Sequence, residues 1–227
     1  MARFCDPLRR VAALYDIHGN LAALDAVLAE IEGDAIVVGG DIVGGERPRE
    51  VLGRLRSLDH VHWVRGNVER ELVDPGPPRD AGPPPGTMEE LKARLTSEDV
   101  EFLFALPERV SLDVEGLGPV LFCHATPRND YEIFTILSPD EKVLEKLEGT
   151  SERVVVCGHT HVQADRGVGE YRVVNAGSVG MPYENQAGAY WALLGPDVEL
   201  RRTEYEGAEE PLASREEASS YFESLAD

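Results

Sequence analysis

The sequence predicts an α/β protein in which two β-sheets pack face to face and helices cover their outer sides. Two observations lead to this fold class. In the first third of the chain, apolar runs of strand length alternate with helical patterns, which is the order of a βαβαβ unit with parallel strands. From residue 109 onward most segments are short and strand-like, and such a half is typical of a second sheet packed against the first.

The first βαβ unit opens the chain. An apolar run at 11–15 ends at Asp16 and is followed by residues 21–31, whose apolar side chains recur at every third or fourth position and therefore share one helical face. A second apolar run at 35–38 leads to Asp41. Because strand, helix and strand follow one another at these lengths, the two strands are expected to be parallel.

The remaining elements follow from the same two patterns, with proline near the start of helices and glycine in turns. A strand and a helical region in two pieces complete the first half, and a hairpin opens the second. The expected helices are 47–57, 87–106 (broken near Thr96 and Ser97), 139–147 and 213–225, and the expected strands are 61–65, 110–114, 119–123, 154–157, 162–166, 170–174, 187–194 and 197–205.

One stretch fits neither pattern. Residues 74–86 contain six prolines and three glycines, a composition that excludes a helix or a central strand. We expect a surface loop or a flap near the functional site. The stretch is too short to indicate a domain boundary, so residues 1–227 are expected to form a single domain.

Composition bounds the function. The formal net charge is −20, from 42 acidic and 22 basic residues, and this charge argues against nucleic-acid binding. The plainer interpretation is that an acidic surface keeps the protein soluble. No apolar run is long enough for a membrane span. The three cysteines are odd in number, and two of them, Cys123 and Cys157, lie in apolar strands, so a reducing cytoplasm is the expected compartment.

Polar side chains of metal-ligand type follow five of the expected strands. Strand ends are where α/β sheets build their sites, so these side chains are expected to converge. Carboxylate and imidazole without thiolate suit Mn, Fe, Zn, Co or Mg. The candidate ligands are Asp16, His18, Asp41, Asn67, His124, His159 and His161.

Seven candidate ligands exceed the four of a single tetrahedral zinc ion. They suffice for two ions if one carboxylate bridges them. Two ions about 3.5–4 Å apart can clamp the attacking and leaving oxygens of an in-line phosphoryl displacement, and a water held between them ionises readily to the attacking hydroxide.

Each signal also has a plainer interpretation. Asp16 and Asp41 can act as helix caps, and the Gly66-Asn67 pair is ordinary turn chemistry. A single histidine after a strand is usually structural. The joint occurrence favours a metal site, because four of the six histidines fall in these motifs.

Two further residues are candidates for substrate contact. Asn20 either orients substrate or caps the helix that starts at Leu21. Arg128 either contacts a phosphate through its guanidinium or pairs with Asp130 and other surface acids.

The ordered motifs resemble the calcineurin-like metallophosphoesterase superfamily, and the Asp16-Ile-His-Gly-Asn-Leu opening resembles its small bacterial phosphodiesterase branch. The resemblance implies a four-layer α/β/β/α sandwich of two mixed sheets flanked by helices. It implies that Asp16, His18, Asp41 and His161 hold a first metal ion, and that a second is held by the bridging Asp41 with Asn67, His124 and His159. Among these, Asp41, Asn67 and His124 are expected to take part in catalysis. Residues 175–180 are expected to lie near the site.

The implied function is hydrolysis of a phosphodiester or a small phosphomonoester, with the diester favoured. Mn²⁺ is the expected ion, with Fe, Zn, Ni, Co and Mg as alternatives. Many members have histidine after the Gly-Asn motif as a proton donor, whereas this chain has Val68, which cannot donate a proton. The residues after Asp41 also lack the Asp-Arg-Gly of protein phosphatases.

Two other functions stay open at this stage. One is a metal-binding scaffold without catalysis on the same fold, although such scaffolds are expected to lack ligands that this chain retains. The other is a nuclease, against which the acidic charge counts. The expected partner is a small phosphorylated molecule, not a membrane or nucleic acid. The physiological substrate does not follow from the sequence, which also leaves a homo-oligomer open.

Overall fold

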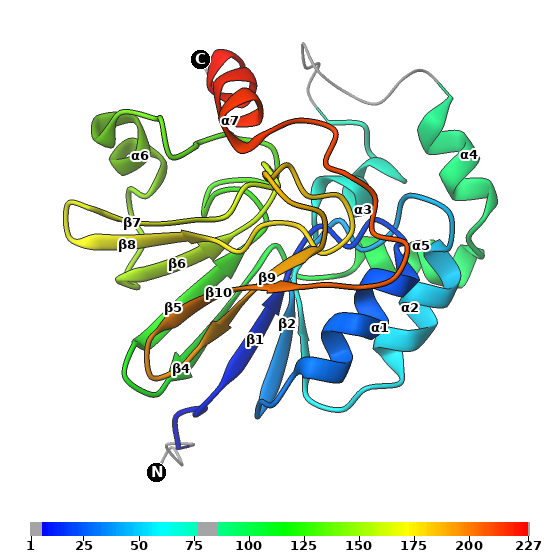
Figure 1. Cartoon of the computed structure of the whole chain (residues 1–227), viewed down its shortest axis with the longest axis horizontal. Helices are drawn as coiled ribbons and strands as arrows, with labels where there is room; N and C mark the ends of the chain where they lie inside the picture. Colours follow the sequence, from blue (N-terminus) through cyan, green and yellow to red (C-terminus); the bar gives the residue numbers. More distant parts are fainter. Residues whose placement is uncertain (1–5, 77–85, 227) are drawn as a thin grey trace.

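A computed structural model of the chain describes residues 6–76 and 86–226 (Figure 1). It contains the strands and helices expected from the sequence, in the expected order, and one further short helix, α3. They are β1 (Val11–Leu14), α1 (Leu21–Glu30), β2 (Ala35–Val38), α2 (Pro48–Arg56), β3 (Val61–Trp63), α3 (Asn67–Glu71), α4 (Thr87–Ala93), α5 (Ser97–Phe104), β4 (Arg109–Val114), β5 (Gly118–Cys123), α6 (Asp140–Lys146), β6 (Val154–Cys157), β7 (Ala164–Val168), β8 (Tyr171–Asn175), β9 (Ala189–Leu194), β10 (Val198–Thr203) and α7 (Arg215–Ser224).

The strands form two mixed sheets of five strands each, in the orders β10-β9-β1-β2-β3 and β4-β5-β6-β8-β7. Strands β1, β2 and β3 are parallel, as are β5, β6 and β8, so the carboxyl ends of each set lie at one edge. The β9–β10 hairpin extends the first sheet, because β9 pairs antiparallel with β1. The predicted four-layer arrangement of helices, two sheets and helices is confirmed.

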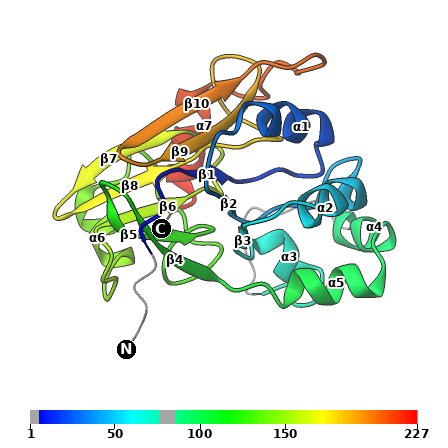
Figure 2. The same cartoon turned by 90° about the horizontal axis from the view of Figure 1, so that it is seen from below.

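Three apolar clusters explain the layers. Side chains alternate along β1, so that Ala12 and Leu14 pack toward the helices while Val11, Ala13 and Tyr15 pack between the sheets. The cluster between the sheets also includes side chains of β5 and β6. A third cluster joins the second sheet to α6. Helices α1, α2 and α5 therefore lie on one side of the paired sheets and α6 on the other (Figure 2).

Most of the expected elements are confirmed, including the break between α4 and α5, where the Thr96 hydroxyl accepts the N–H of Asp99 as an N-cap. Strand β7 begins two residues later than predicted. The short helix α3 was not expected. Most of the proline-rich stretch 74–86 lies outside the described residues. Among the described helices, none is long and apolar enough to cross a membrane.

Candidate metal centre

The candidate ligands meet at the carboxyl ends of the parallel strands. Asp16 and His18 follow β1, Asp41 follows β2, and His124 follows β5 directly. The remaining three follow β3 and β6. These are Asn67, which is the first residue of α3, and His159 and His161. Both sheets thus contribute loops to one site, as expected from the sequence.

The backbone of this site is strained. Among described residues other than glycine, six have positive φ, and five of them are candidate ligands: Asp16 (53°), His18 (46°), Asp41 (50°), His159 (67°) and His161 (59°). Side-chain-bearing residues adopt this conformation only when their surroundings enforce it, and such strain concentrates at functional sites.

Hydrogen bonds between loops enforce that conformation. The N–H of Asp16 donates to Gly40 O at 3.1 Å, and the N–H of His18 donates to Asp41 O at 2.9 Å. The N–H of Gly158 donates to His124 O at 2.9 Å and so joins the two loops of the second sheet. The backbone is therefore fixed before any ligand binds.

The side chains form two clusters, each of three groups whose ligand atoms lie within 4.8 Å of one another. The first cluster is Asp16, His18 and His161, and the second is Asp41, His124 and His159. Asp41 faces both, with Oδ2 3.8 Å from His18 Nε2 and Oδ1 3.5 Å from His124 Nε2. The structure thus brings six of the seven predicted ligands into two adjoining groups, with a carboxylate placed between them.

The seventh predicted ligand, Asn67, lies beside the second cluster. Its Oδ1 is 3.1 Å from His124 Nε2, and its Nδ2 donates to Glu71 Oε1 at 3.3 Å. Because the carboxylate of Glu71 can only accept, this contact orients the amide so that the oxygen faces the cluster.

Backbone carbonyls orient two of the imidazoles. His124 Nδ1 lies 2.9 Å from Gly39 O, and His161 Nδ1 lies 2.7 Å from Met181 O. A carbonyl oxygen only accepts, so Nδ1 carries the proton in both rings. When the ring is neutral, Nε2 presents its lone pair to the cluster, which is the arrangement of a metal-binding histidine. Burial alone would lower the pKa of both rings, but in the metal-free fold the nearby carboxylates, Asp41 first for His124 and Asp16 first for His161, raise it above the usual value.

The charges of the centre also favour a cation. Burial would raise the pKa of Asp16, but the imidazoles around it, His161 first, hold that pKa below its usual range. Burial, reinforced by the charges of Glu69 and Asp16, raises the pKa of Asp41 to about 7. Burial lowers the pKa of His18 to about 3, which leaves this ring neutral at pH 7. A cation would offset the cost of burying both carboxylates.

One buried oxygen marks the place of that cation. Asp16 Oδ1 is buried and has no hydrogen-bond partner within 6–76 and 86–226, whereas Asp16 Oδ2 accepts the N–H of His159 at 2.9 Å. Oδ1 lies 3.4 Å from His161 Nε2 and 3.9 Å from His18 Nε2. A buried unpaired carboxylate oxygen is costly, and a metal ion would supply its partner. The donor set therefore fits divalent metal ions.

A buried carboxylate behind the ligands supports them. Glu69, in α3, accepts backbone N–H groups from Asp41 and Gly66 through Oε2 and from Ile42 and Val43 through Oε1, at 2.8–3.3 Å. Burial raises the pKa of this carboxyl, while the N–H groups act in the opposite sense. The support that Glu69 gives to the Asp41 loop could not be foreseen without knowing α3.

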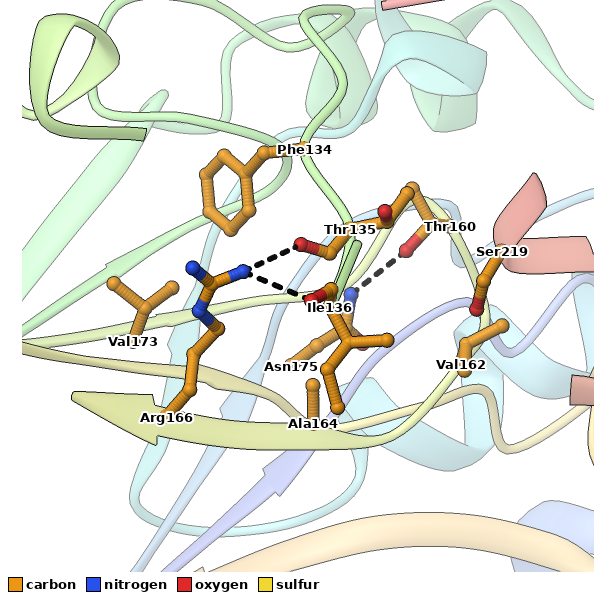
Figure 3. A pocket seen from close by; sticks show the side chains of 10 residues that line it. All are labelled: Phe134, Thr135, Ile136, Thr160, Val162, Ala164, Arg166, Val173, Asn175 and Ser219. Carbon is orange, nitrogen blue, oxygen red and sulfur yellow. Dashed lines mark hydrogen bonds between the residues drawn. The ribbon is translucent and has the colours of Figure 1, made fainter. Parts of the chain in front are cut away.

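Residues 175–180 lie beside the candidate metal centre, as predicted, and they support the loops after β1 and β6. The Ser178 hydroxyl donates to Asp16 O at 2.8 Å, and Asn175 Nδ2 donates to Gly158 O at 2.7 Å and to Thr160 Oγ1 at 3.0 Å. Figure 3 shows Thr160 and Asn175 on the wall of a small cavity, with Ser219 of α7 at its edge. These bonds hold the loop that carries His159 and His161.

The two candidate substrate-contacting residues have protein partners. Asn20 Oδ1 accepts the N–H of Ala23 as the N-cap of α1, so the cap is present, and Nδ2 donates separately to Gly180 O at 3.1 Å. Arg128 is paired with Glu132 at 2.7 Å and with Glu145 at 3.6 Å. The expected alternative partner Asp130 is instead bound by Arg70.

A glycine keeps the Asp41 loop close to α3. A Cβ on Gly66 would lie 2.3 Å from Asp41 Oδ1 and 2.4 Å from Asp41 N. Its φ of −94° suits any residue, so the constraint is space alone. We expect Gly66→Ala to lower the free energy of unfolding by about 2 kcal/mol in urea titrations.

The matched control is Gly53→Ala within α2, where no described atom lies within 4 Å of the added Cβ. This change should stabilise the chain by about 0.5–1 kcal/mol, because alanine favours helix more than glycine does. Equal effects of both substitutions would refute the packing argument.

A two-sheet sandwich with imidazole and carboxylate clusters at its strand ends defines the class of metallophosphoesterases. The family model described as "Calcineurin-like phosphoesterase superfamily domain" matches residues 10–195. The chain therefore belongs to the calcineurin-like phosphoesterase superfamily, as the motifs predicted.

Individual relatives agree. The chain is similar to the uncharacterized protein MJ0912 of Methanocaldococcus jannaschii, with 29% identity over 86% of this chain and 88% of the relative. A metallophosphoesterase from Sphaerobacter thermophilus is 26% identical over 87% of this chain and 89% of its own, with a TM-score of 0.68. A hypothetical protein, PH1004, from Pyrococcus horikoshii shares the fold with a TM-score of 0.75 at 23% identity, over 95% and 94% of the two chains.

Proposed function

We propose that this chain is a metal-dependent phosphoric ester hydrolase with a binuclear centre, acting on a phosphodiester or a small phosphomonoester. The observation that carries the proposal is the pair of adjoining clusters joined through Asp41, with the unpaired buried oxygen of Asp16 between imidazoles. Two divalent ions, with Mn²⁺ as the expected occupant, would activate water and offset the charge of the phosphoryl group.

Within this proposal the ligands divide as the motifs imply. Asp16, His18 and His161 hold one ion, and Asn67, His124 and His159 hold the other, with Asp41 shared. Asp41, Asn67 and His124 line the side at which the phosphoryl group would be bound and oriented. The proposal fits a small phosphorylated substrate and a reducing cytoplasm, where the buried thiols Cys123 and Cys157 stay free.

The residue that follows the Gly-Asn motif bears on substrate choice. Val68 offers no side-chain proton, and its N–H donates to Asp41 Oδ1 at 2.9 Å. A leaving alcohol would therefore receive no proton from this position, which favours esters whose leaving group is stable as an anion. This supports aryl and other activated diesters as the first substrates to test.

The test is hydrolysis of bis-p-nitrophenyl phosphate and p-nitrophenyl phosphate by metal-stripped protein, with Mn²⁺, Ni²⁺, Zn²⁺ or Mg²⁺ added back. We expect metal-dependent turnover with preference for the diester. Mn²⁺ at about 100 times its Kd should also add about 2.7 kcal/mol of stability and raise Tm. Binding of two ions without turnover of either ester would instead favour a metal-binding scaffold, and turnover without added metal would contradict the proposal.

A further inference from the structure

A cavity of about 500 Å³ adjoins the candidate metal centre, because His18 of the first cluster also lines the cavity. Its far wall is residues 205–212, which connect β10 to α7 (Figure 1, orange to red). Ligand sites commonly have volumes of about 300–1,000 Å³. The cavity is therefore large enough for an organic group attached to a phosphate held at the centre.

The wall lies outside the residues that the family model matches. The family model ends at residue 195, ten residues before Tyr205. The candidate metal ligands lie within the matched residues, and the wall follows them. Specificity commonly resides in such added segments carried on a rigid scaffold.

Contacts at both ends fix the wall in place. At its start, Tyr205 OH accepts Asn20 Nδ2–H at 3.1 Å, next to the first cluster. Beyond its end, the N–H of Arg215 donates to Asn185 Oδ1 at 3.1 Å, at the start of α7. The ring of Tyr183 stacks on His161, with centroids 5.1 Å apart, and also contacts Phe222 of α7 at 5.9 Å. The wall therefore has a defined position relative to the metal ligands.

The lining combines apolar surface with negative charge. Leu212, 80% exposed, and Pro211 face the same space as Met181. Among the described lining residues there are three carboxylates, Glu46, Glu209 and Glu210, and a single guanidinium, that of Arg47. Arg47 is already paired with Glu50, its Nε lying 3.2 Å from Oε1.

We propose that residues 205–212 make this cavity selective for phosphodiesters whose organic group is uncharged or cationic, and against groups that carry further phosphate or other anionic substituents. The proposal rests on the hydrolase function proposed above. Metal ions held by the two clusters would receive the phosphoryl end, and the cavity, which His18 of the first cluster also lines, receives the rest. A second anion would meet net negative charge there, whereas an alkyl or ammonium group meets apolar surface and carboxylates.

The reaction remains a simple hydrolysis. Water adds to phosphorus, the P–O bond to one alcohol breaks, and that alcohol leaves with a proton from the water. The other alcohol stays on the product as a phosphomonoester. Selection therefore acts on binding and not on the bond chemistry.

The test measures binding of symmetrical dialkyl phosphates to the Mn²⁺-loaded full chain by calorimetry at low ionic strength. The three probes carry 2-(trimethylammonio)ethyl, 3,3-dimethylbutyl or 2-sulfoethyl groups, which differ in charge at similar size. Because both ester groups of each probe are identical, the result does not depend on which of them enters the cavity. We expect the first two to bind roughly tenfold or more tightly than the third.

The diagnostic variant is the double substitution Glu209→Gln and Glu210→Gln, which should raise the cationic-to-anionic ratio of Kd values roughly tenfold, toward one. The control is Glu115→Gln with Glu148→Gln, which changes net charge equally at exposed positions that do not line the cavity. An unchanged ratio in the first variant, or an equal change in both, would overturn the proposal. Hydrolysis of bis-p-nitrophenyl phosphate is measured separately, so its loss would refute the hydrolase function independently of the selectivity.

Discussion

Asp41→Asn is expected to lower kcat/KM for bis-p-nitrophenyl phosphate by roughly 10³-fold or more, because each cluster loses the charge of the carboxylate placed between them. A lost charge interaction of about 4 kcal/mol in the transition state corresponds to that factor. Asparagine keeps the shape of the side chain and an oxygen for the N–H of Val68. Metal content after dialysis should fall below two ions per chain.

The same substitution should not unfold the protein. Burial raises the pKa of Asp41 to about 7 in the fold, above its ordinary value of 3.8, so the ionised carboxylate destabilises the metal-free fold as pH rises above 3.8. Removing this carboxyl should leave the Tm of the metal-free chain equal or higher. Asp25→Asn is the control, since Asp25 is paired with Arg54 at the surface. Full activity in Asp41→Asn would refute the assignment of the bridging ligand.

The convergence of the candidate ligands could be predicted because each position depends on a local pattern. Asp16, Asp41 and His124 each follow an apolar strand, and parallel strands bring their carboxyl ends to one edge whatever the details of packing. The positive φ angles of Asp16 and Asp41 could not be foreseen. They result from hydrogen bonds between loops, such as that from the N–H of His18 to Asp41 O, which join segments far apart in sequence.

Long-range pairing explains the other features that the sequence did not predict. The β9–β10 hairpin was recognised as two strands, but its place beside β1 depends on contacts such as Val11 with Leu194, across most of the chain. Helix α3 has only five residues, too few for a periodic pattern. Two features therefore could not be predicted from the sequence. One is the position of residues 205–212 near His18, which follows from the place of this hairpin, and the other is the support that Glu69 gives to the Asp41 loop.

Glu69→Ala is expected to cost about 3 kcal/mol in the free energy of unfolding. The carboxylate accepts four backbone N–H groups inside the protein, from Asp41, Ile42, Val43 and Gly66, and truncation leaves these donors without their charged acceptor. The loop that positions Asp41 would loosen. Removing an outer partner of a metal ligand typically lowers metal affinity about 10- to 100-fold, and equilibrium dialysis with Mn²⁺ would measure this.

Two further variants are needed to interpret this result. Glu69→Gln keeps the volume but can accept through only one atom, and its NH₂ group would face backbone donors, so we expect a stability between those of the parent and Glu69→Ala. Glu98→Ala, at a side chain that is 83% exposed in α5, should unfold at the parent's denaturant midpoint. If Glu69→Ala loses stability but binds Mn²⁺ as the parent does, Glu69 supports the fold alone. If it keeps both, the four N–H groups find other partners and the carboxylate does not hold the Asp41 loop.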